Sequence, residues 1–185
     1  MNAYDLPSSL EIGGRAYAIR SGWRSVMDIF AALNDPELDT DGKVIAMLTI
    51  LFPEHDQIPP KDIPAAIASA CEFLDCGQQE KEGNHPRLMD WEQDAPLIVP
   101  AVNAVTGRDI RLDPNLHWWT FFGMFMSVEG GLFGSVLRVR QKKAKGKKLD
   151  KWEEEFYREN KNLVDLKARE TSEIRAEKDN ILKYL

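Results

Sequence analysis

The sequence predicts a mainly α-helical protein: a compact multi-helix domain with a small N-terminal β-hairpin and a long C-terminal helix. Through most of the chain, apolar residues recur every three or four positions, which is the helical period. One short stretch near the N-terminus instead alternates with a period of two around a Gly-Gly pair. From residue 149 onward the chain contains neither proline nor glycine and is rich in charged residues.

The composition fits a folded protein with an extension. The chain has 185 residues, 43% of them hydrophobic and 29% charged, which is enough apolar material for a core. Residues 1–137 carry 9 basic and 20 acidic side chains, whereas residues 138–185 carry 15 and 10. This split predicts parts with different roles. We expect a domain over 1–140, a basic hinge over 141–148 and a charged helix over 149–185.

The period-two stretch predicts the hairpin. Leu10 and Ile12 alternate with polar residues, and Tyr17 and Ile19 continue the alternation after the turn. Gly13-Gly14 can adopt the positive φ angles that a two-residue turn requires. Because an isolated hairpin is only marginally stable in water, we expect it to pack on a helix.

Three helices follow in the prediction. The first carries an apolar stripe from Trp23 to Leu33 and ends before Asp35-Pro36, because the residue before proline disfavours the helical conformation. The second is capped by Thr40 and stops at Phe52-Pro53. The third starts at Asp62 and ends before Gly77.

Two prolines interrupt the next apolar segment, which runs from Met89 to Val105. An interior proline costs a helix about 3 kcal/mol. We therefore predict a break near Asp94–Ala95, with Pro96 in the first turn of the following helix and a kink at Pro100.

A strongly aromatic helix is predicted after Asp113-Pro114, which combine a capping residue with a first-turn proline. Its stretch from Leu116 to Met126 is the most apolar in the chain, so we expect burial on nearly every side. Gly130-Gly131 then makes a turn, and one more helix begins at Leu132.

The predicted C-terminal helix would extend about 55 Å at 1.5 Å per residue, too long to pack wholly on a domain of this size. Its apolar residues follow heptad spacing from Leu149 to Leu166 and are sparser beyond. Such exposed residues favour binding of a partner helix or a second copy, the alternative being a solvated helix held by charge pairs. The candidate protein-binding residues are Trp152, Phe156, Leu163, Leu166 and Ile174.

No residue pattern indicates catalysis, a cofactor or a metal. Cys71 and Cys76 lack the paired CxxC spacing of zinc sites, even with His85 nearby, and we interpret them as reduced thiols. His117 has no neighbouring nucleophile motif, so we interpret it as a hydrogen-bonded residue at a helix start. A weak enzyme hypothesis rests on His117 alone.

Two charged clusters have a binding alternative. Asp90, Glu92 and Asp94 could bind a cation, but they lack the glycine and ligand spacing of a calcium loop. Their position before a helix N-terminus, which favours negative charge, explains them better. The lysines of 142–148 could contact nucleic acid, but the acidic run Glu153–Glu155 follows at once and a solubilising role is favoured.

Several motifs occur in a fixed order along the chain: Asp5-Leu6-Pro7, Leu10 to Gly14, Leu51-Phe52-Pro53, Ile58-Pro59-Pro60, Phe73 to Gly77, Asp90 to Ala95 and Leu116 to Phe121. Together they resemble a phage and prophage family of tail-assembly chaperones encoded just upstream of the tape-measure gene. The resemblance covers about residues 5–140, and only the Leu-His-Trp-Trp motif is distinctive by itself. Pro96 and Pro100 depart from the smoother helix we associate with the family, and the C-terminal extension is longer and more charged.

The resemblance implies a chaperone that binds the long, helical tape-measure protein until tail-tube subunits polymerise around it. It carries over no catalytic or ligand-binding residue. We expect the tape-measure protein as partner, with self-association and tail-tube contact as further interactions, no cofactor and no membrane span. The absence of a signal-like segment or long apolar run leads us to expect the bacterial host cytoplasm. The alternative function is a structural tail or baseplate component.

Overall fold

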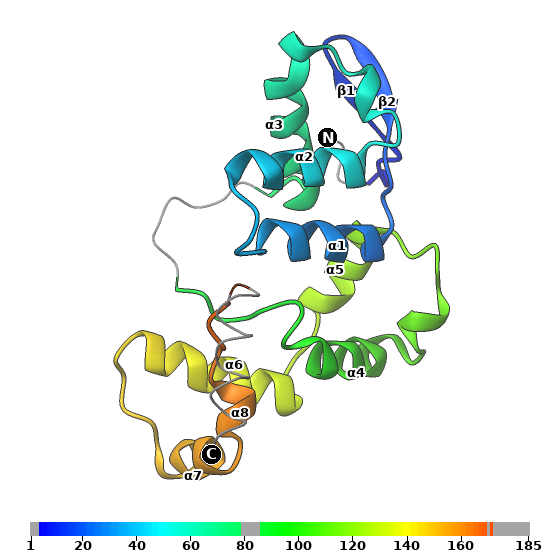
Figure 1. Cartoon of the computed structure of the whole chain (residues 1–185). Coiled ribbons are helices and arrows are strands. Elements are labelled where there is room, and N and C mark those ends of the chain that lie inside the picture. The colour runs from blue at the N-terminus through cyan, green and yellow to red at the C-terminus, as the bar shows by residue number, and fades with distance from the viewer. Residues whose placement is uncertain (1–3, 79–85, 170, 172–185) are drawn as a thin grey trace, which may run out of the picture. The chain divides into compact units, whose positions relative to one another are not determined.

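The computed structural model describes residues 4–78, 86–169 and 171, and it confirms the predicted mainly helical fold with an N-terminal hairpin (Figure 1). The chain divides into two compact units. Unit 1 comprises Met1–Leu74 and Ala168–Leu185, and unit 2 comprises Asp75–Lys167.

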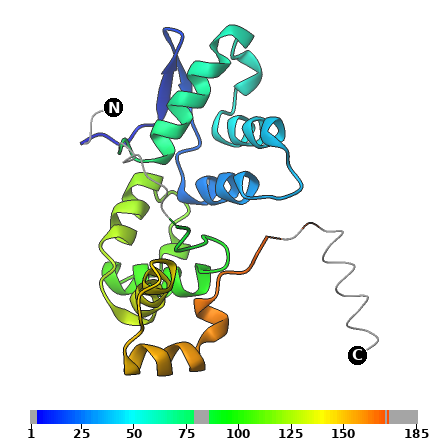
Figure 2. The same cartoon turned by 90° about the vertical axis from the view of Figure 1, so that its left-hand side faces the viewer.

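The hairpin of unit 1 is confirmed. Strand β1 (Ser9–Ile12) pairs antiparallel with β2 (Arg15–Ala18), and Leu10 lies opposite Tyr17. The turn residues Gly13 and Gly14 have φ angles of 58° and 82°, which glycine adopts without a steric penalty. One face of the hairpin is buried, and Figure 2 shows it beside a long helix of the same unit, α3.

Three α-helices complete the described part of unit 1. They are α1 (Trp23–Leu33), α2 (Thr40–Leu51) and α3 (Ile63–Leu74), with 3-10 turns η1 (His55–Gln57) and η2 (Pro60–Asp62) before α3. Asp39, not Thr40, caps α2, because its carboxylate accepts a hydrogen bond from the Gly42 N–H at 2.8 Å. Near the other end of the chain, Arg169 donates to the carbonyl of Asn34 at 3.0 Å. The core includes Leu10, Ile12, Val26, Ile29, Leu51, Phe52, Ala66, Ala70 and Phe73.

Unit 2 begins its regular structure with α4 (Ala95–Thr106). As predicted, the helix starts after Asp94, Pro96 lies in its first turn and Pro100 lies inside it. Gly107 ends α4 in a left-handed conformation with φ 67°. A 3-10 turn, η3 (Ile110–Leu112), follows.

The predicted start of the aromatic helix at Asp113-Pro114 is wrong. Asp113 closes η3, and α5 runs only over Trp118–Met126. The cap is His117, whose Nδ1 accepts a hydrogen bond from the Trp119 N–H at 3.0 Å. The structure thereby confirms the interpretation of His117 as a residue at a helix start.

The expectation that this helix is buried on nearly every side is also wrong. Trp118 and Phe121 are buried, but Met126 is 61% exposed and Trp119, Phe122 and Phe125 are half-buried. A nine-residue helix packed on one side has room for only one buried face. The buried face joins an aromatic cluster in which Trp91 lies 5.8 Å from Trp118 and 4.9 Å from Phe125, centroid to centroid.

The predicted continuous helix over 149–185 is not observed. After α6 (Gly131–Ala144), the chain forms two short helices, α7 (Lys151–Glu159) and α8 (Lys161–Val164). Asn160 separates them with φ −119° and ψ 31°, and Asp165 is extended. The side-chain amide of Asn160 donates to the Phe156 carbonyl at 3.0 Å. Such a side-chain bond competes with continuation of the helix. The remainder of the predicted helix, 172–185, lies outside the described residues.

The break at Asn160 lets α8 fold back onto α6. Val164 of α8 is buried with Val136 and Val139 of α6 in one hydrophobic cluster. Half-buried Leu97, Leu149, Phe156, Tyr157 and Leu163 pack against that cluster. Burial of these apolar side chains makes the folded-back arrangement of two short helices more stable than a straight helix that would leave them in solvent.

The basic stretch predicted as a hinge also gains structure. Residues 141–144 form the last turn of α6, Lys145 caps it, and Gly146 has φ 62°. Lys142 pairs with the buried Glu153, and Lys143 lies 2.7 Å from the Asp165 carboxylate. The structure therefore ties two lysines of this stretch to α7 and to the chain after α8.

Candidate functional site

Four of the five candidate protein-binding residues, Trp152, Phe156, Leu163 and Leu166, lie at the C-terminal end of unit 2, on α7, on α8 and just beyond. A capping box sets α7: the Asp150 side chain accepts from the Glu153 N–H at 3.0 Å, and Glu153 accepts from the Asp150 N–H at 2.9 Å. Glu153 is 1% exposed and also bonds Lys142. The capping box and the burial of Glu153 fix the orientation of α7, on which Trp152 is exposed.

Among the candidate residues that the structure describes, Trp152 is the most exposed. Its side chain is 52% exposed and stacks on Phe156, with ring centroids 5.3 Å apart and an interplanar angle of 22°. Phe156 in turn rests on the valine cluster of α6 and α8. Of the two stacked rings, Trp152 is therefore exposed to solvent, whereas Phe156 packs against the core.

The other predicted residues do not form one exposed face. Leu163 packs into the valine cluster from α8, and Leu166 is half-buried in the extended stretch after it. Ile174 lies outside the described residues. The structure brings Phe156 and Leu163 to the same cluster as packing residues, and among the four described candidates it leaves Trp152 exposed.

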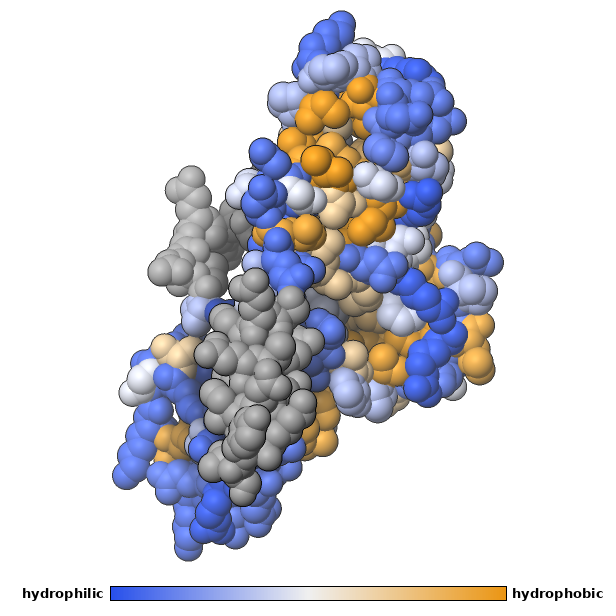
Figure 3. Space-filling model, viewed as in Figure 1, coloured by the Kyte–Doolittle hydropathy of each residue, from blue (hydrophilic) through white to orange (hydrophobic). Residues whose placement is uncertain are grey.

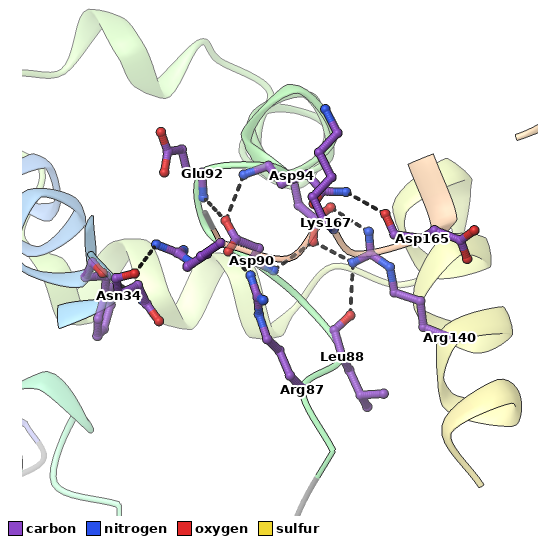
Figure 4. Close-up of polar contacts among 12 residues, drawn as sticks. Asn34, Arg87, Leu88, Asp90, Glu92, Asp94, Arg140, Asp165 and Lys167 are labelled. Carbon is purple, nitrogen blue, oxygen red and sulfur yellow. Dashed lines mark hydrogen bonds and ion pairs between the residues drawn. The ribbon is translucent and has the colours of Figure 1, made fainter. Parts of the chain in front are cut away.

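A buried ion pair, which the sequence analysis missed, holds the same region together (Figure 4). Arg140 of α6 is 5% exposed and Asp94, which precedes α4, is 1% exposed. The guanidinium binds the carboxylate through two contacts, Nη1 to Oδ2 at 2.6 Å and Nη2 to Oδ1 at 2.8 Å. Two parallel hydrogen bonds of this kind are the strongest geometry an arginine and a carboxylate can adopt.

Arg140 also satisfies backbone carbonyls. Its Nε donates to Val164 at 2.7 Å, Nη2 to Leu163 at 2.7 Å and Nη1 to Leu88 at 3.0 Å. All five guanidinium N–H groups therefore have acceptors. The carbonyls of 163 and 164 belong to the last turn of α8, whose own amides cannot satisfy them. Arg140 thus caps α8 from within the core.

Gln93 fastens the chain after α8. Its amide Nε2 donates to the Asp165 carbonyl at 3.0 Å, and its Oε1 accepts from the Lys167 N–H at 2.9 Å. One side chain thereby bonds the extended backbone at two alternate residues, as a neighbouring strand would. The segment before α4 and the segment after α8 are consequently held together.

The acidic residues before α4 are engaged by protein groups. Asp90 accepts from the N–H groups of Glu92 and Gln93 at 2.9 and 2.8 Å, and its other oxygen pairs with Arg87. Asp94 pairs with Arg140, and its side chain makes no capping hydrogen bond to α4. Asp94 does lie at the N-terminus of α4, as the sequence interpretation expects, and Asp90 and Asp94 each have an arginine partner in addition. Over the described residues, no group of three or more His, Cys, Asp or Glu is arranged to hold a metal ion.

The electrostatics of this end of unit 2 follow from these pairs. The backbone hydrogen bond from Glu153 lowers the pKa of Asp150, with Lys142 adding to the effect. Burial raises the pKa of Asp165, but hydrogen bonds from Lys143 and Tyr157 outweigh it, and the net pKa lies below the usual value. The ammonium of Lys143 also lies 3.7 Å from the Tyr157 ring centroid, a cation–π contact.

Neither cysteine forms a disulfide. Burial raises the pKa of the Cys76 thiol to about 12, and the charge of Asp75 adds to this shift. A thiol with such a pKa is protonated near neutral pH and is a poor nucleophile. This agrees with the interpretation of Cys76 as a reduced thiol.

In the part of the chain that the structure describes, no single helix is both long and apolar enough to cross a membrane. The pair α5 and α6 meets the length and composition criterion only when joined across a 76° bend.

Comparison with known proteins places the chain in a phage family. Residues 3–166 match the model of the family described as Bacteriophage Gp15 protein, so the match includes α7 and α8 as well as the N-terminal motifs. Comparison with curated proteins gives no match. Comparison with solved structures gives none either. The chain belongs to the Bacteriophage Gp15 protein family.

Proposed function

We propose that this phage protein is a tail-assembly chaperone that binds the tape-measure protein in the cytoplasm of the bacterial host. The observation that carries the proposal is the Trp152–Phe156 stack, a half-exposed aromatic pair on a firmly capped helix. Tryptophan is enriched among the residues that dominate protein-binding energy, and an exposed ring on a rigid base loses little entropy on binding.

The chain's charge supports the same role. A chaperone that holds an apolar partner must keep the complex soluble, and it needs charged surface beside its binding residues. Lys151, Glu154, Glu155 and Arg158 lie on the same helix as Trp152 and are exposed. No catalytic step is required, since preferential binding of the unassembled partner is sufficient.

The test is co-expression of the tape-measure protein with the full chain or its variants. We expect the wild type to keep the tape-measure protein in the soluble fraction and Trp152→Ala to reduce that fraction strongly. Leu112→Ala is the matched control, because Leu112 is an apolar residue of the same unit that is 82% exposed. Equal solubility with Trp152→Ala would assign binding to another surface. An insoluble partner with the wild type would refute the chaperone role.

Point variants are preferable to removal of residues 141–185. Such a truncation would delete Val164 from the valine cluster and leave the Arg140 guanidinium without the carbonyls of 163 and 164. Loss of solubility would then report misfolding of unit 2.

The alternative is a structural tail or baseplate component that remains in the particle. Mass spectrometry of purified particles separates the two roles. A chaperone is absent or far below the copy number of the tail proteins, whereas a structural component is present in fixed stoichiometry.

A further inference from the structure

Helix α4 has two apolar faces, and only one is covered. Ile98 and Val102 point into the core of unit 2, with exposures of 2% and 0%. The opposite face is accessible, since Pro96, Pro100, Ala104 and Val105 are all exposed. The pocket beside this face is lined on α4 by Pro96, Leu97, Pro100, Ala101, Ala104 and Val105, of which Leu97 also packs against the valine cluster.

This face forms one wall of a groove, which we call the α4 groove. The other wall is the turn between α5 and α6 together with the start of α6, residues 127–133. The groove has a volume of about 560 Å³ and is open to solvent. Leu132, 48% exposed, and Val105, 45% exposed, stand on opposite walls. On the face of the molecule seen in Figure 3, apolar side chains likewise reach the surface between polar ones.

Two acceptors lie at the α4 groove, beside the Ser127 hydroxyl and the first-turn N–H groups of α6. Glu129 is the one charged residue in its lining, and in the described part of the chain it makes no ion pair or hydrogen bond. A second acceptor follows from the sequence of α4. Pro100 has no N–H, so the carbonyl of Pro96, one turn earlier, lacks the donor that it would have in a regular helix.

We propose that the α4 groove binds an amphipathic helical segment of a partner protein, with apolar residues along one face and a lysine or arginine beside them. The apolar walls would take side chains at helical spacing, as helix-in-groove complexes do, and the cation would pair with Glu129. The twelve residues of α4 extend about 18 Å, which matches about three turns of a partner helix.

The identity of the partner as the tape-measure protein rests on the proposed function. A second copy of this chain fits less well, because an isologous contact through this face would set hollow against hollow and leave both grooves unfilled. The small side chains of Ala101 and Ala104 instead allow a convex helix to approach the α4 backbone closely.

The experiment measures binding of fluorescein-labelled, overlapping helical peptides from the tape-measure protein to the full chain by anisotropy. Ala104→Trp fills the α4 groove and should weaken binding by about tenfold or more. Glu129→Lys should weaken it by about threefold. A peptide in which the facing lysine or arginine is changed to glutamate should recover affinity for Glu129→Lys and lose it for the wild type.

Matched controls lie in the same unit but outside the groove. Leu112→Trp adds an exposed aromatic ring elsewhere, and Glu92→Lys reverses an exposed acid elsewhere; both should bind as the wild type does. Circular dichroism verifies that each variant is folded.

Three outcomes would overturn the inference. Equal binding by wild type, Ala104→Trp and Glu129→Lys, while the wild type keeps the tape-measure protein soluble, refutes the groove and leaves the chaperone role standing. A dimer in sedimentation that Ala104→Trp dissociates makes a second copy the occupant. No peptide binding together with no solubilisation refutes both proposals.

Discussion

Arg140 and Asp94 form a two-contact ion pair inside unit 2, between residues 46 positions apart in the sequence. Their side chains are 4% and 1% exposed, so the pair is removed from water. Desolvating two charges is costly, and the low polarity around them strengthens the attraction only if every donor and acceptor is satisfied. Here the remaining guanidinium donors bond the carbonyls of 88, 163 and 164.

Arg140→Ala is therefore expected to lower the free energy of unfolding by about 3–5 kcal/mol, because the Asp94 carboxylate stays buried without its partner. Urea unfolding followed by tryptophan fluorescence measures the change. Arg138→Ala, on the exposed side of α6, is the control and should change stability by less than about 0.5 kcal/mol.

A double variant separates the pair from its parts. Asp94→Leu with Arg140→Met removes both charges, so the loss should be smaller than the sum of the single losses. A strictly additive result would show that the two residues act independently and would contradict the ion pair as the source of the effect.

The ion pair also shows which features of unit 2 can be predicted from the sequence and which cannot. The apolar period of Phe133 and Val136 indicated a helix, and that helix is α6. Arg140 lies on the same buried stripe as those residues, an unusual place for a charge, and that position was the available signal. Its partner Asp94 could not be identified, because a pairing over 46 positions depends on how α4 and α6 pack.

The prediction of a continuous C-terminal helix was wrong for a related reason. Propensity and the absence of proline or glycine favour a continuous helix after residue 149, and no local signal outweighs them except Asn160. The break is determined by tertiary burial of Val164 on Val136 and Val139. The hairpin, in contrast, was predictable in detail, since its turn and its alternation are both local features.

Acid should destabilise unit 2 through Asp150 and Asp165. Both have pKa values below the ordinary aspartate value in the folded chain. A depressed pKa contributes stability that is present above the unfolded pKa, about 3.9, and is lost as pH falls through the folded value. The free energy of unfolding, measured by urea titration, should therefore fall progressively as the pH is lowered below about 4.

The corresponding variants test this assignment. Asp150→Asn together with Asp165→Asn should make the acid limb of the stability profile less steep; part of it should remain, because hydrogen bonds from Arg111 also lower the pKa of Asp109. Asp113→Asn is a suitable control, because Asp113 is a carboxylate of the same unit that pairs with Arg108. An unchanged acid limb in the double variant would assign the pH dependence to other carboxylates.

The hairpin turn offers a matched pair of glycines. Both Gly13 and Gly14 have positive φ, so alanine at either position costs about 1–2 kcal/mol in backbone strain. At Gly13 a Cβ atom would also lie 2.8 Å from an Asp62 carboxylate oxygen, whereas at Gly14 it would meet nothing within 4 Å. Gly13→Ala should therefore destabilise unit 1 more than Gly14→Ala, as measured by urea unfolding.

The excess at Gly13 should depend on Asp62. In the background of Asp62→Ala, the two glycine substitutions should become nearly equal in cost, since the close contact is gone. If the excess persists in that background, the contact with Asp62 is not its cause.

Trp152 and Phe156 stack on each other but should differ in what they do. Phe156 packs against Val136, Val139 and Val164, so Phe156→Ala leaves a cavity and should cost several times more stability than Trp152→Ala. Trp152 is 52% exposed, and its removal should lower the free energy of unfolding by about 1 kcal/mol or less, mainly through the lost ring contact. Urea unfolding of the two variants gives this comparison directly.

A large stability loss for Trp152→Ala would make Trp152 a packing residue, and the variant could then no longer be used to test partner binding. A small loss with an intact circular dichroism spectrum would mean that any binding defect of Trp152→Ala reflects the surface and not the fold.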